Sequence, residues 1–133
     1  MISLAARTTL VSSVLSTMPS YAMQTVPLPL STCDEIDKRC RNFIWGSNSA
    51  RRKPHLVSWN SVCARKEDGG LGLRKARHQN QAFMMKLGWG MINKRDSIWV
   101  RFLREKYKAG NDIIPKVQKR NLESNTWRGI CHN

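Results

Sequence analysis

Acidic side chains suited to acid–base or metal chemistry are few in this sequence. It has 9 Asp and Glu residues, and the densest group is Asp34, Glu35 and Asp37. A two-metal phosphoryl-transfer site needs acids that converge from separate elements, typically with an adjacent Asp-Asp pair, and the sequence has no such pair. Acids in the first turn of a helix stabilise its dipole. We therefore interpret this group as the start of a helix and not as an active site.

The candidate nucleophiles and metal ligands are scattered along the chain. They are Cys33, Cys40, Cys63, Cys131, His55, His78 and His132. No two cysteines have the Cys-x-x-Cys spacing of a zinc site, and no serine has the Gly-x-Ser-x-Gly context of a hydrolase nucleophile. The sequence therefore predicts no catalytic residue, no metal site, no cofactor and no enzymatic activity for this chain by itself. Because we expect no secretory leader, we also expect reduced and mostly buried thiols.

Positive charge is the strongest functional signal. The 133 residues include 23 Lys and Arg against 9 Asp and Glu, a formal charge of +14, which favours a polyanionic partner and most simply nucleic acid. One basic group lies between residues 38 and 53, and a second lies between residues 65 and 77. No recognition helix or zinc finger is visible, so we expect contacts to the backbone without sequence readout. The predicted nucleic-acid-binding residues are Arg41, Arg51, Arg52, Lys53, Lys66, Arg74, Lys75 and Arg77.

The first 33 residues differ from the rest because Arg7 is their only charged residue. Several Ser, Thr and Pro residues interrupt every apolar run in this segment, which excludes a membrane span. Leu4, Thr8, Val11 and Leu15 share one helical face, and we expect Pro19 to interrupt that helix. We expect an intracellular protein of the nucleus or cytoplasm. A mitochondrial transit segment is a weaker alternative, since one Arg is few for that class.

Further helices should position the basic groups. The Thr-x-x-Glu spacing of Thr32 and Glu35 predicts a capping box at the start of a second helix, which Gly46 would end. A third helix is predicted from about Lys75 to Asn93. A fourth would follow Asp96, with a buried side formed by Ile98, Trp99, Phe102, Leu103 and Tyr107. We expect Trp89 and Trp99 in the core, and the sequence leaves the places of Trp45 and Trp59 open.

These patterns predict a mainly α fold: a small helical domain or fragment with one short β-hairpin-like segment near residues 56–73, around a tight turn at Gly69-Gly70-Leu71-Gly72. We divide the chain into a helical pair at 1–46, a basic loop and Gly-Gly turn at 47–74, a helical pair at 75–110 and an irregular segment at 111–133.

An ordered series of motifs gives the chain a family resemblance. The motifs are Leu10-Val11-x-x-Val14-Leu15-x-x-Met18-Pro19-x-Tyr21-x-Met23-Gln24, Leu28-Pro29, Ile36-Asp37-Lys38, Arg41-Asn42-Phe43-Ile44-Trp45-Gly46, Trp59-x-x-Val62-Cys63-x-x-Lys66-x-x-Gly69-Gly70-Leu71-Gly72-Leu73-Arg74, Asn80-x-Ala82-x-x-x-Lys86-x-x-Trp89 and Trp99-x-x-x-Leu103-x-x-Lys106-Tyr107. In this order they resemble the region just after the polymerase core of plant non-LTR (LINE-type) retrotransposon reverse transcriptases.

The resemblance implies a place in a longer polyprotein. In this family the catalytic Asp-Asp motif of the RNA-directed DNA polymerase lies upstream, and a Cys/His zinc-binding segment and often a ribonuclease H domain lie downstream. Residues 1–46 would then be a thumb-like helical pair, and 111–133 a linker towards the zinc-binding domain. The expected function is that of a reverse transcriptase fragment without the catalytic residues, which binds an RNA–DNA hybrid or RNA through its backbone.

A second hypothesis comes from another class of function. The chain could be a structural or interaction remnant that packs on the missing polymerase core, with no independent activity and with charge that only keeps it soluble. This hypothesis predicts large exposed apolar surface on the isolated chain.

Overall fold

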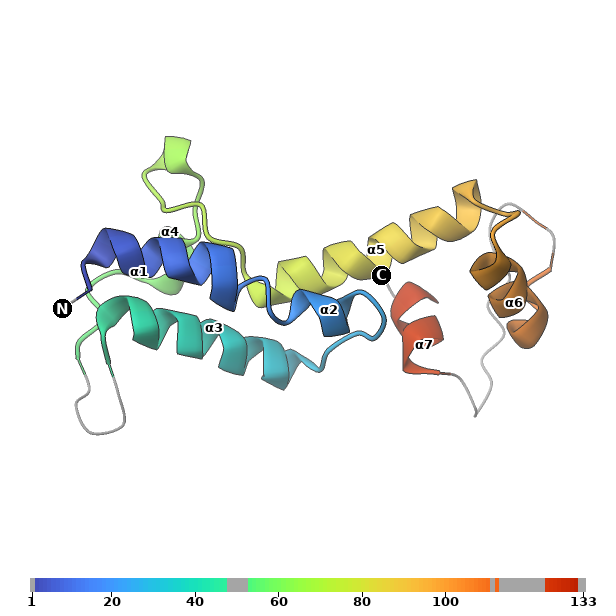
Figure 1. The fold of residues 1–133 in the computed structure, drawn as a ribbon, viewed down its shortest axis with the longest axis horizontal. Coiled ribbons are helices and arrows are strands. Elements are labelled where there is room, and N and C mark those ends of the chain that lie inside the picture. Colours follow the sequence, from blue (N-terminus) through green and yellow to red (C-terminus); the bar gives the residue numbers. More distant parts are fainter. Residues whose placement is uncertain (1, 48–52, 111, 113–123, 132–133) are drawn as a thin grey trace.

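A computed structural model describes residues 2–47, 53–110, 112 and 124–131, and within these ranges the chain is helical (Figure 1). Its elements are α1 (Leu4–Leu10), the π-helical η1 (Val11–Leu15), α2 (Ser20–Met23), α3 (Leu30–Trp45), α4 (Trp59–Val62), the 3-10 turn η2 (Lys66–Asp68), α5 (Ala76–Asn93), α6 (Ile98–Tyr107) and α7 (Asn125–Cys131). The predicted mainly α fold is confirmed. No helix in these ranges is long and apolar enough to cross a bilayer.

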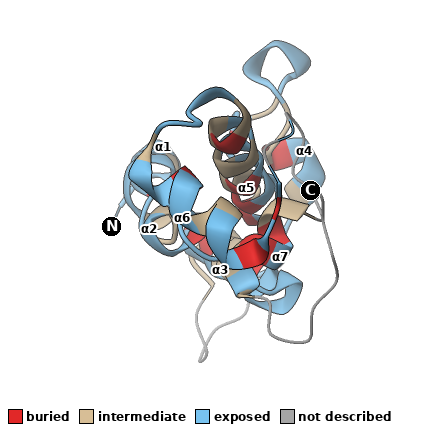
Figure 2. Cartoon of the chain, turned by 90° about the vertical axis from the view of Figure 1, so that its right-hand side faces the viewer, coloured by how far each residue is buried: buried red, intermediate tan, exposed pale blue. Residues whose placement is uncertain are grey.

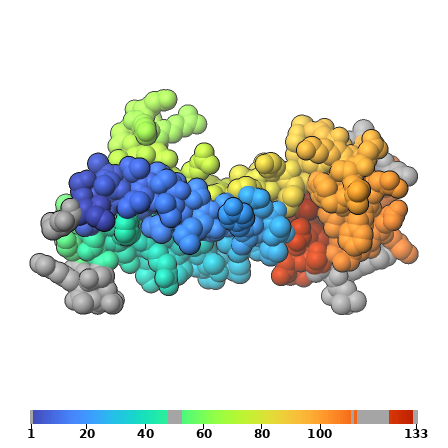
Figure 3. Space-filling view, in the orientation of Figure 1, coloured from blue at the N-terminus to red at the C-terminus, as the bar shows by residue number. Residues whose placement is uncertain are grey.

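The molecule is elongated, with the N-terminal helices at one end and α6 and α7 at the other (Figures 1 and 3). Helix α5 connects the two ends and contacts α2, α3 and α7. Seen along the long axis in Figure 2, the buried residues lie where helices meet around α5, and the outer faces of α1 and α6 are exposed. Small separate cores, and not one large core, therefore hold the helices together.

The first core joins η1, α3, α4 and the segment that follows the glycine turn. Its buried members are Val11, Cys40, Ile44, Val62 and Leu73. The predicted interruption at Pro19 is confirmed, because η1 ends before it and the short α2 follows it. Gly46 ends α3 with a positive φ of 64°, also as predicted.

The lone charge of the N-terminal segment contacts the end of α3. The Nη1 of Arg7 donates to the carbonyl of Ile44 at 3.5 Å, where the unpaired carbonyls of the last helical turn carry partial negative charge. A Cβ at Gly46 would lie 2.1 Å from the same Nη1, so the glycine leaves room for the guanidinium. This contact ties α1 to the end of α3.

The acids at 34–37 do not form the predicted helix start. Helix α3 begins at Leu30 after Pro29, without a side-chain cap, so the capping-box prediction is wrong. Asp37 instead accepts the backbone N–H of Ala76 through Oδ1 at 3.0 Å and thereby caps α5. Because α5 packs on α3, an acid from the middle of one helix satisfies the first turn of the other.

The segment 56–73 is not a β-hairpin. The Ser58 side chain accepts the backbone N–H of Ser61 at 3.2 Å and caps the short helix α4 where a strand was expected. Two backbone hydrogen bonds still close the glycine turn. They run from Leu71 N–H to the Val62 carbonyl and from Gly72 N–H to the Ala64 carbonyl, both at 2.9 Å. The glycine turn was therefore predicted correctly, but the strands around it were not.

A second core holds the far end of the molecule. Its buried members are Met91, Val100, Tyr107, Ala109 and Trp127. The rings of Tyr107 and Trp127 stack with centroids 4.5 Å apart, and the Tyr107 hydroxyl bonds the Ser124 hydroxyl at 2.7 Å. Arg104 donates to the carbonyl of Met91 at 3.2 Å and so joins α6 to α5.

The buried side of α6 is rotated from the predicted one. Val100 and Tyr107 are buried and Leu103 is half-buried, whereas Ile98 and Phe102 are 85% and 60% exposed. The prediction that Trp89 is a core residue is also wrong, since it is 66% exposed. Only one face of α6 packs against α5 and α7. The apolar residues of α6 cover more than this face, so Ile98 and Phe102 stay exposed.

Helix α7 lies in the range 111–133, where the sequence analysis expected irregular structure. Its Thr126 hydroxyl donates to the Thr25 carbonyl at 2.6 Å, and α7 packs against α5. Contacts with residues about a hundred positions away stabilise this short helix, which explains why no local pattern indicated it. Residues 111 and 113–123 lie outside the described part of the chain.

Candidate nucleic-acid interface

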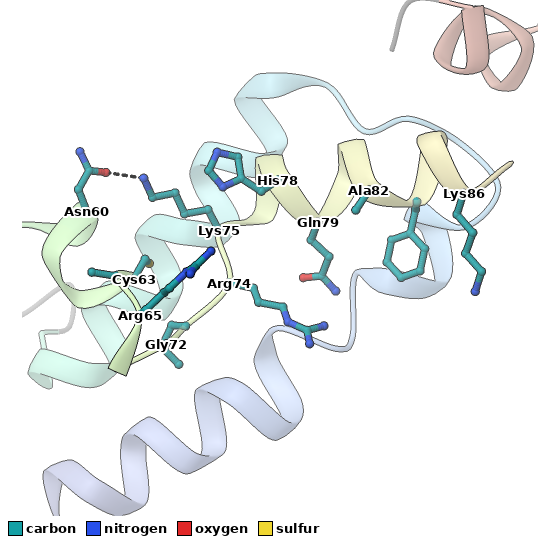
Figure 4. A pocket seen from close by; sticks show the side chains of 13 residues that line it. Asn60, Cys63, Arg65, Gly72, Arg74, Lys75, His78, Gln79, Ala82 and Lys86 are labelled. Carbon is teal, nitrogen blue, oxygen red and sulfur yellow. Dashed lines mark hydrogen bonds between the residues drawn. The ribbon is translucent and has the colours of Figure 1, made fainter. Parts of the chain in front are cut away.

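A hollow of about 660 Å³ lies between α4, the segment that follows the glycine turn and the first half of α5 (Figure 4). We call it the basic groove. Its lining residues are Asn60, Cys63, Ala64, Arg65, Gly72, Leu73, Arg74, Lys75, His78, Gln79, Ala82, Phe83 and Lys86. Four of these are Lys or Arg, and none of the described lining residues is acidic, so the groove suits a polyanion.

One wall of the groove is a single face of α5 and the residue before it. Positions 75, 78, 82 and 86 are spaced by three and four residues, so they follow one face of the helix, from which the side chains of His78 and Lys86 extend in different directions (Figure 4). Asn60 holds Lys75, since its Oδ1 accepts a hydrogen bond from Lys75 Nζ at 2.8 Å. This contact restrains the ammonium group beside the groove.

The glycine turn builds the opposite wall. Gly69 and Gly72 have φ values of 80° and 67°, which L side chains rarely adopt. A Cβ at Gly70 would lie 2.1 Å from the Ala64 carbonyl oxygen, so only glycine permits this close approach. The turn thereby brings Arg65 and Arg74 to the same hollow.

The structure places the predicted binding residues in different surroundings. Arg74 and Lys75 line the basic groove together. Lys66 is exposed and lines another hollow, beside α1. Lys53 is exposed, and its backbone N–H donates to the Ser47 hydroxyl at 3.0 Å, which closes the base of the basic loop. Arg51 and Arg52 lie outside the described residues.

Two predicted binding residues, Arg77 and Arg41, lie outside the basic groove. Arg77 donates from Nε and Nη2 to the two carboxylate oxygens of Asp34 at 2.7 and 2.6 Å. This bidentate pair lowers the pKa of Asp34, chiefly through the hydrogen bond from Arg77. Arg41 is half-buried on α3, and its Nε has no acceptor among the described residues. Neither side chain lines the basic groove.

Arg65, His78 and Lys86 also line the groove, although they were not among the predicted binding residues. The helical spacing from Lys75 through His78 to Lys86 was a usable signal, because a phosphate-binding face along a helix requires it. The place of Arg65 depends on the glycine turn, which folds the chain back, and no periodicity indicates it.

The groove also contains a thiol, Cys63. Burial, followed by the nearby charge of Asp37, raises its pKa to about 11. The thiol therefore stays protonated near neutral pH and is a poor nucleophile. Among the described residues no three His, Cys, Asp or Glu side chains are arranged to hold a metal ion.

Comparison with known proteins places the chain in a family. It belongs to the same family as the "Uncharacterized mitochondrial protein AtMg00310" of Arabidopsis thaliana, with 31% identity over 116 residues, 86% of this chain and 75% of that protein. It is also 40% identical over 135 residues to the "Putative ribonuclease H protein At1g65750" of the same plant. That alignment covers 98% of this chain and 21% of the relative, so the chain spans only a minor part of that protein.

No family model matches the chain, and no solved structure matches it.

Proposed function

We propose that this chain is a retrotransposon-derived segment, corresponding to the thumb and connection region of a reverse transcriptase, that binds the sugar–phosphate backbone of nucleic acid in the basic groove. The observation that carries the proposal is the convergence of Arg65, Arg74, Lys75 and Lys86 on one hollow whose described lining has no acid. Cations gathered in a groove release counterions from a nucleic acid when it binds. The relative named as a ribonuclease H protein supports a nucleic-acid context for the segment.

The groove favours a duplex held by its phosphates. Its wall of Lys75, His78 and Lys86 extends along α5 for about 16 Å, since eleven residues rise 1.5 Å each in a helix. Lys75 and Lys86, at the two ends of this wall, can each contact a phosphate of the same strand. We propose an RNA–DNA hybrid as the preferred ligand, because the resemblance to a reverse transcriptase implies a template–primer duplex.

Absence of catalysis by the isolated chain is part of the proposal. The thiol in the groove is protonated, and Asp37 and Asp34 cap and pair with α5. The chain should therefore leave a labelled hybrid intact on incubation with Mg²⁺. Cleavage of the RNA strand that survives repurification of the protein would contradict this part of the proposal.

A second candidate function is packing against another part of a longer protein. Met18, Leu30 and Leu4 are 65%, 61% and 55% exposed, and exposed apolar side chains such as these can pack against a protein partner. This function does not exclude the first, because the exposed residues lie on α1, α3 and the segment before α2, and not in the basic groove.

The test is a titration of labelled RNA–DNA hybrid, DNA duplex and single-stranded RNA with three proteins. The wild type should bind the hybrid most tightly. Arg74→Ala/Lys75→Ala, which removes two groove cations, should bind it at least tenfold more weakly. The charge-matched control Arg95→Ala/Arg101→Ala removes two exposed cations near and on α6 and should change the affinity less than threefold. Equal weakening by both variants would mean that net charge, and not the groove, determines binding.

A further inference from the structure

Two tryptophans expected in the core are instead on the surface and close together. Trp89 is 66% exposed and Trp99 is 37% exposed. Both line a second hollow of about 500 Å³, between the second half of α5 and the start of α6. We call it the aromatic hollow. A large exposed indole is unfavourable in water, so the pair calls for a partner with an apolar face.

Trp99 lies directly against α5 because residue 90 is glycine. A Cβ at Gly90 would lie 3.1 Å from Cζ2 and 3.3 Å from Cη2 of the Trp99 ring, closer than most such contacts. Because Gly90 has no side chain, the Trp99 indole can approach the helix there. Gly90 directly follows Trp89 in the sequence and lies about one helical turn before Asn93. The packing fixes the Trp99 ring as one wall of the hollow.

The aromatic hollow is also basic. Lys86 and Lys94 line it, and none of its described lining residues is acidic. The hollow is also lined by two side-chain amides, Gln24 and Asn93, and by the aromatic ring of Phe83. Indole faces beside ammonium groups are the combination that binds single-stranded nucleic acid, where bases stack on the rings and phosphates pair with the cations.

The aromatic hollow continues the basic groove. Phe83 and Lys86 line both hollows, so the two are neighbours along α5. A strand whose phosphates lie in the groove would pass Lys86 and reach Trp89 and Trp99 next. Bases inside a duplex are stacked on their neighbours and cannot use these rings, whereas bases beyond the end of the duplex can.

We propose that Trp89 and Trp99 form a stacking site for unpaired nucleobases next to the end of a duplex held in the basic groove. This inference rests on the proposed function and adds its ligand class: a junction between double-stranded and single-stranded nucleic acid. Lys94 would contact a phosphate of the unpaired strand, and Lys86 a phosphate near the junction.

The test compares one RNA–DNA hybrid in several forms: blunt, with a short thymidine overhang of either polarity, and with the same overhang made of abasic sugar–phosphate. The abasic overhang keeps the phosphates and removes the bases, so the ratio of the two overhang affinities measures stacking alone. For the wild type we expect the base-bearing overhang of one polarity to bind about tenfold more tightly than the abasic one. Its binding should also quench tryptophan fluorescence.

The variants assign the stacking to the two indoles. Trp89→Ala and Trp99→Ala should bring the ratio close to one, and Trp89→Phe should restore part of it because phenylalanine keeps a ring face. Trp89→Leu should not restore it. Tyr21→Ala, which removes an aromatic side chain that is 83% exposed and outside both hollows, should leave the ratio unchanged. Trp89 is well exposed, so its variants should fold even if Trp99→Ala does not.

The outcomes separate this inference from the proposed function. Blunt hybrid that binds in the groove, with a ratio near one for the wild type, would overturn the stacking site and leave the groove intact. A tenfold ratio that survives both tryptophan variants would also overturn it, and would leave the indoles free to pack on a protein partner. Failure of every ligand to bind at low salt would overturn both proposals.

Discussion

The Asn80 side chain is joined to the backbone of Leu28 by two hydrogen bonds. Its Oδ1 accepts the Leu28 N–H at 3.0 Å, and its Nδ2 donates to the Leu28 carbonyl at 3.1 Å. Asn80 is only 8% exposed, and it is the buried polar residue of the described core. The side-chain amide of Asn80, on α5, thus satisfies both backbone groups of Leu28. This pair of hydrogen bonds holds the connection between α2 and α3 against α5.

Replacing Asn80 should therefore destabilise the fold strongly. Asn80→Leu leaves both backbone groups of Leu28 without a partner, and each unsatisfied buried group costs about 1–3 kcal/mol. We expect the free energy of unfolding in urea to fall by roughly 2–4 kcal/mol. Gln79→Leu, at the neighbouring half-buried position, is the control and should change it by less than about 1 kcal/mol. Equal effects of the two substitutions would contradict the role of Asn80.

The ion pair between Asp34 and Arg77 should make stability depend on pH. The bidentate contact lowers the Asp34 pKa in the folded state, so the unfolded state binds the proton more readily. The contribution is therefore present at neutral pH and is lost as the pH falls below about 4. Urea unfolding should show Asp34→Asn to be less stable than the wild type at pH 7, and the difference should shrink as the pH falls through and below the ordinary carboxyl range. A constant difference across this range would contradict the pairing.

Cys63 should react slowly with alkylating reagents. With its pKa raised to about 11 by burial, only a small fraction of the thiol is ionised at pH 8. We expect its rate of modification by iodoacetamide, followed by peptide mass spectrometry, to be at least about a hundredfold below that of free cysteine. The rate should rise steadily with pH up to about 11 while the protein stays folded. A plateau near pH 8 would show that the thiol has an ordinary pKa.

Two glycine-to-alanine substitutions should have opposite effects on stability. A Cβ at Gly129 would lie 2.7 Å from Pro27 Cγ and 2.8 Å from Met84 Sδ, so Gly129→Ala should push α7 away and cost about 1–3 kcal/mol. At Gly88 the nearest atom, Ile130 Cγ2, is 3.6 Å away, an ordinary contact. Gly88→Ala should stabilise α5 by up to about 1 kcal/mol. Thermal unfolding measures both, and stabilisation by Gly129→Ala would mean that α7 does not pack as described.

The sequence was most informative where local signals determine the structure. The interruption at Pro19, the end of α3 at Gly46 and the extent of α5 follow from the fixed φ of proline, the positive φ available to glycine and the helical period. The start of α3 was misplaced because Asp37 and Asp34 serve α5 and not their own helix. The strands expected around Gly69-Gly70 were wrong because Ser58 caps a helix there.

The candidate site was predicted only in part, for a related reason. Arg74 and Lys75 were selected from a charge cluster and do line the groove. Arg77 belongs to the same cluster, but its partner Asp34 is 43 residues away in the sequence, and charge counting cannot reveal such a pair. Trp89 was assigned to the core by its apolar pattern, although α6 and α7 cover only part of α5.

The most direct test of the central claim is the salt dependence of hybrid binding for the wild type and for Arg74→Ala/Lys75→Ala. The slope of log K against log salt measures how many phosphates the protein neutralises, at about 0.9 per contact in a duplex. Loss of two groove contacts should make the slope shallower by about 2, whereas Arg95→Ala/Arg101→Ala should leave it unchanged. An identical slope for wild type and groove variant would show that the basic groove does not hold the nucleic acid.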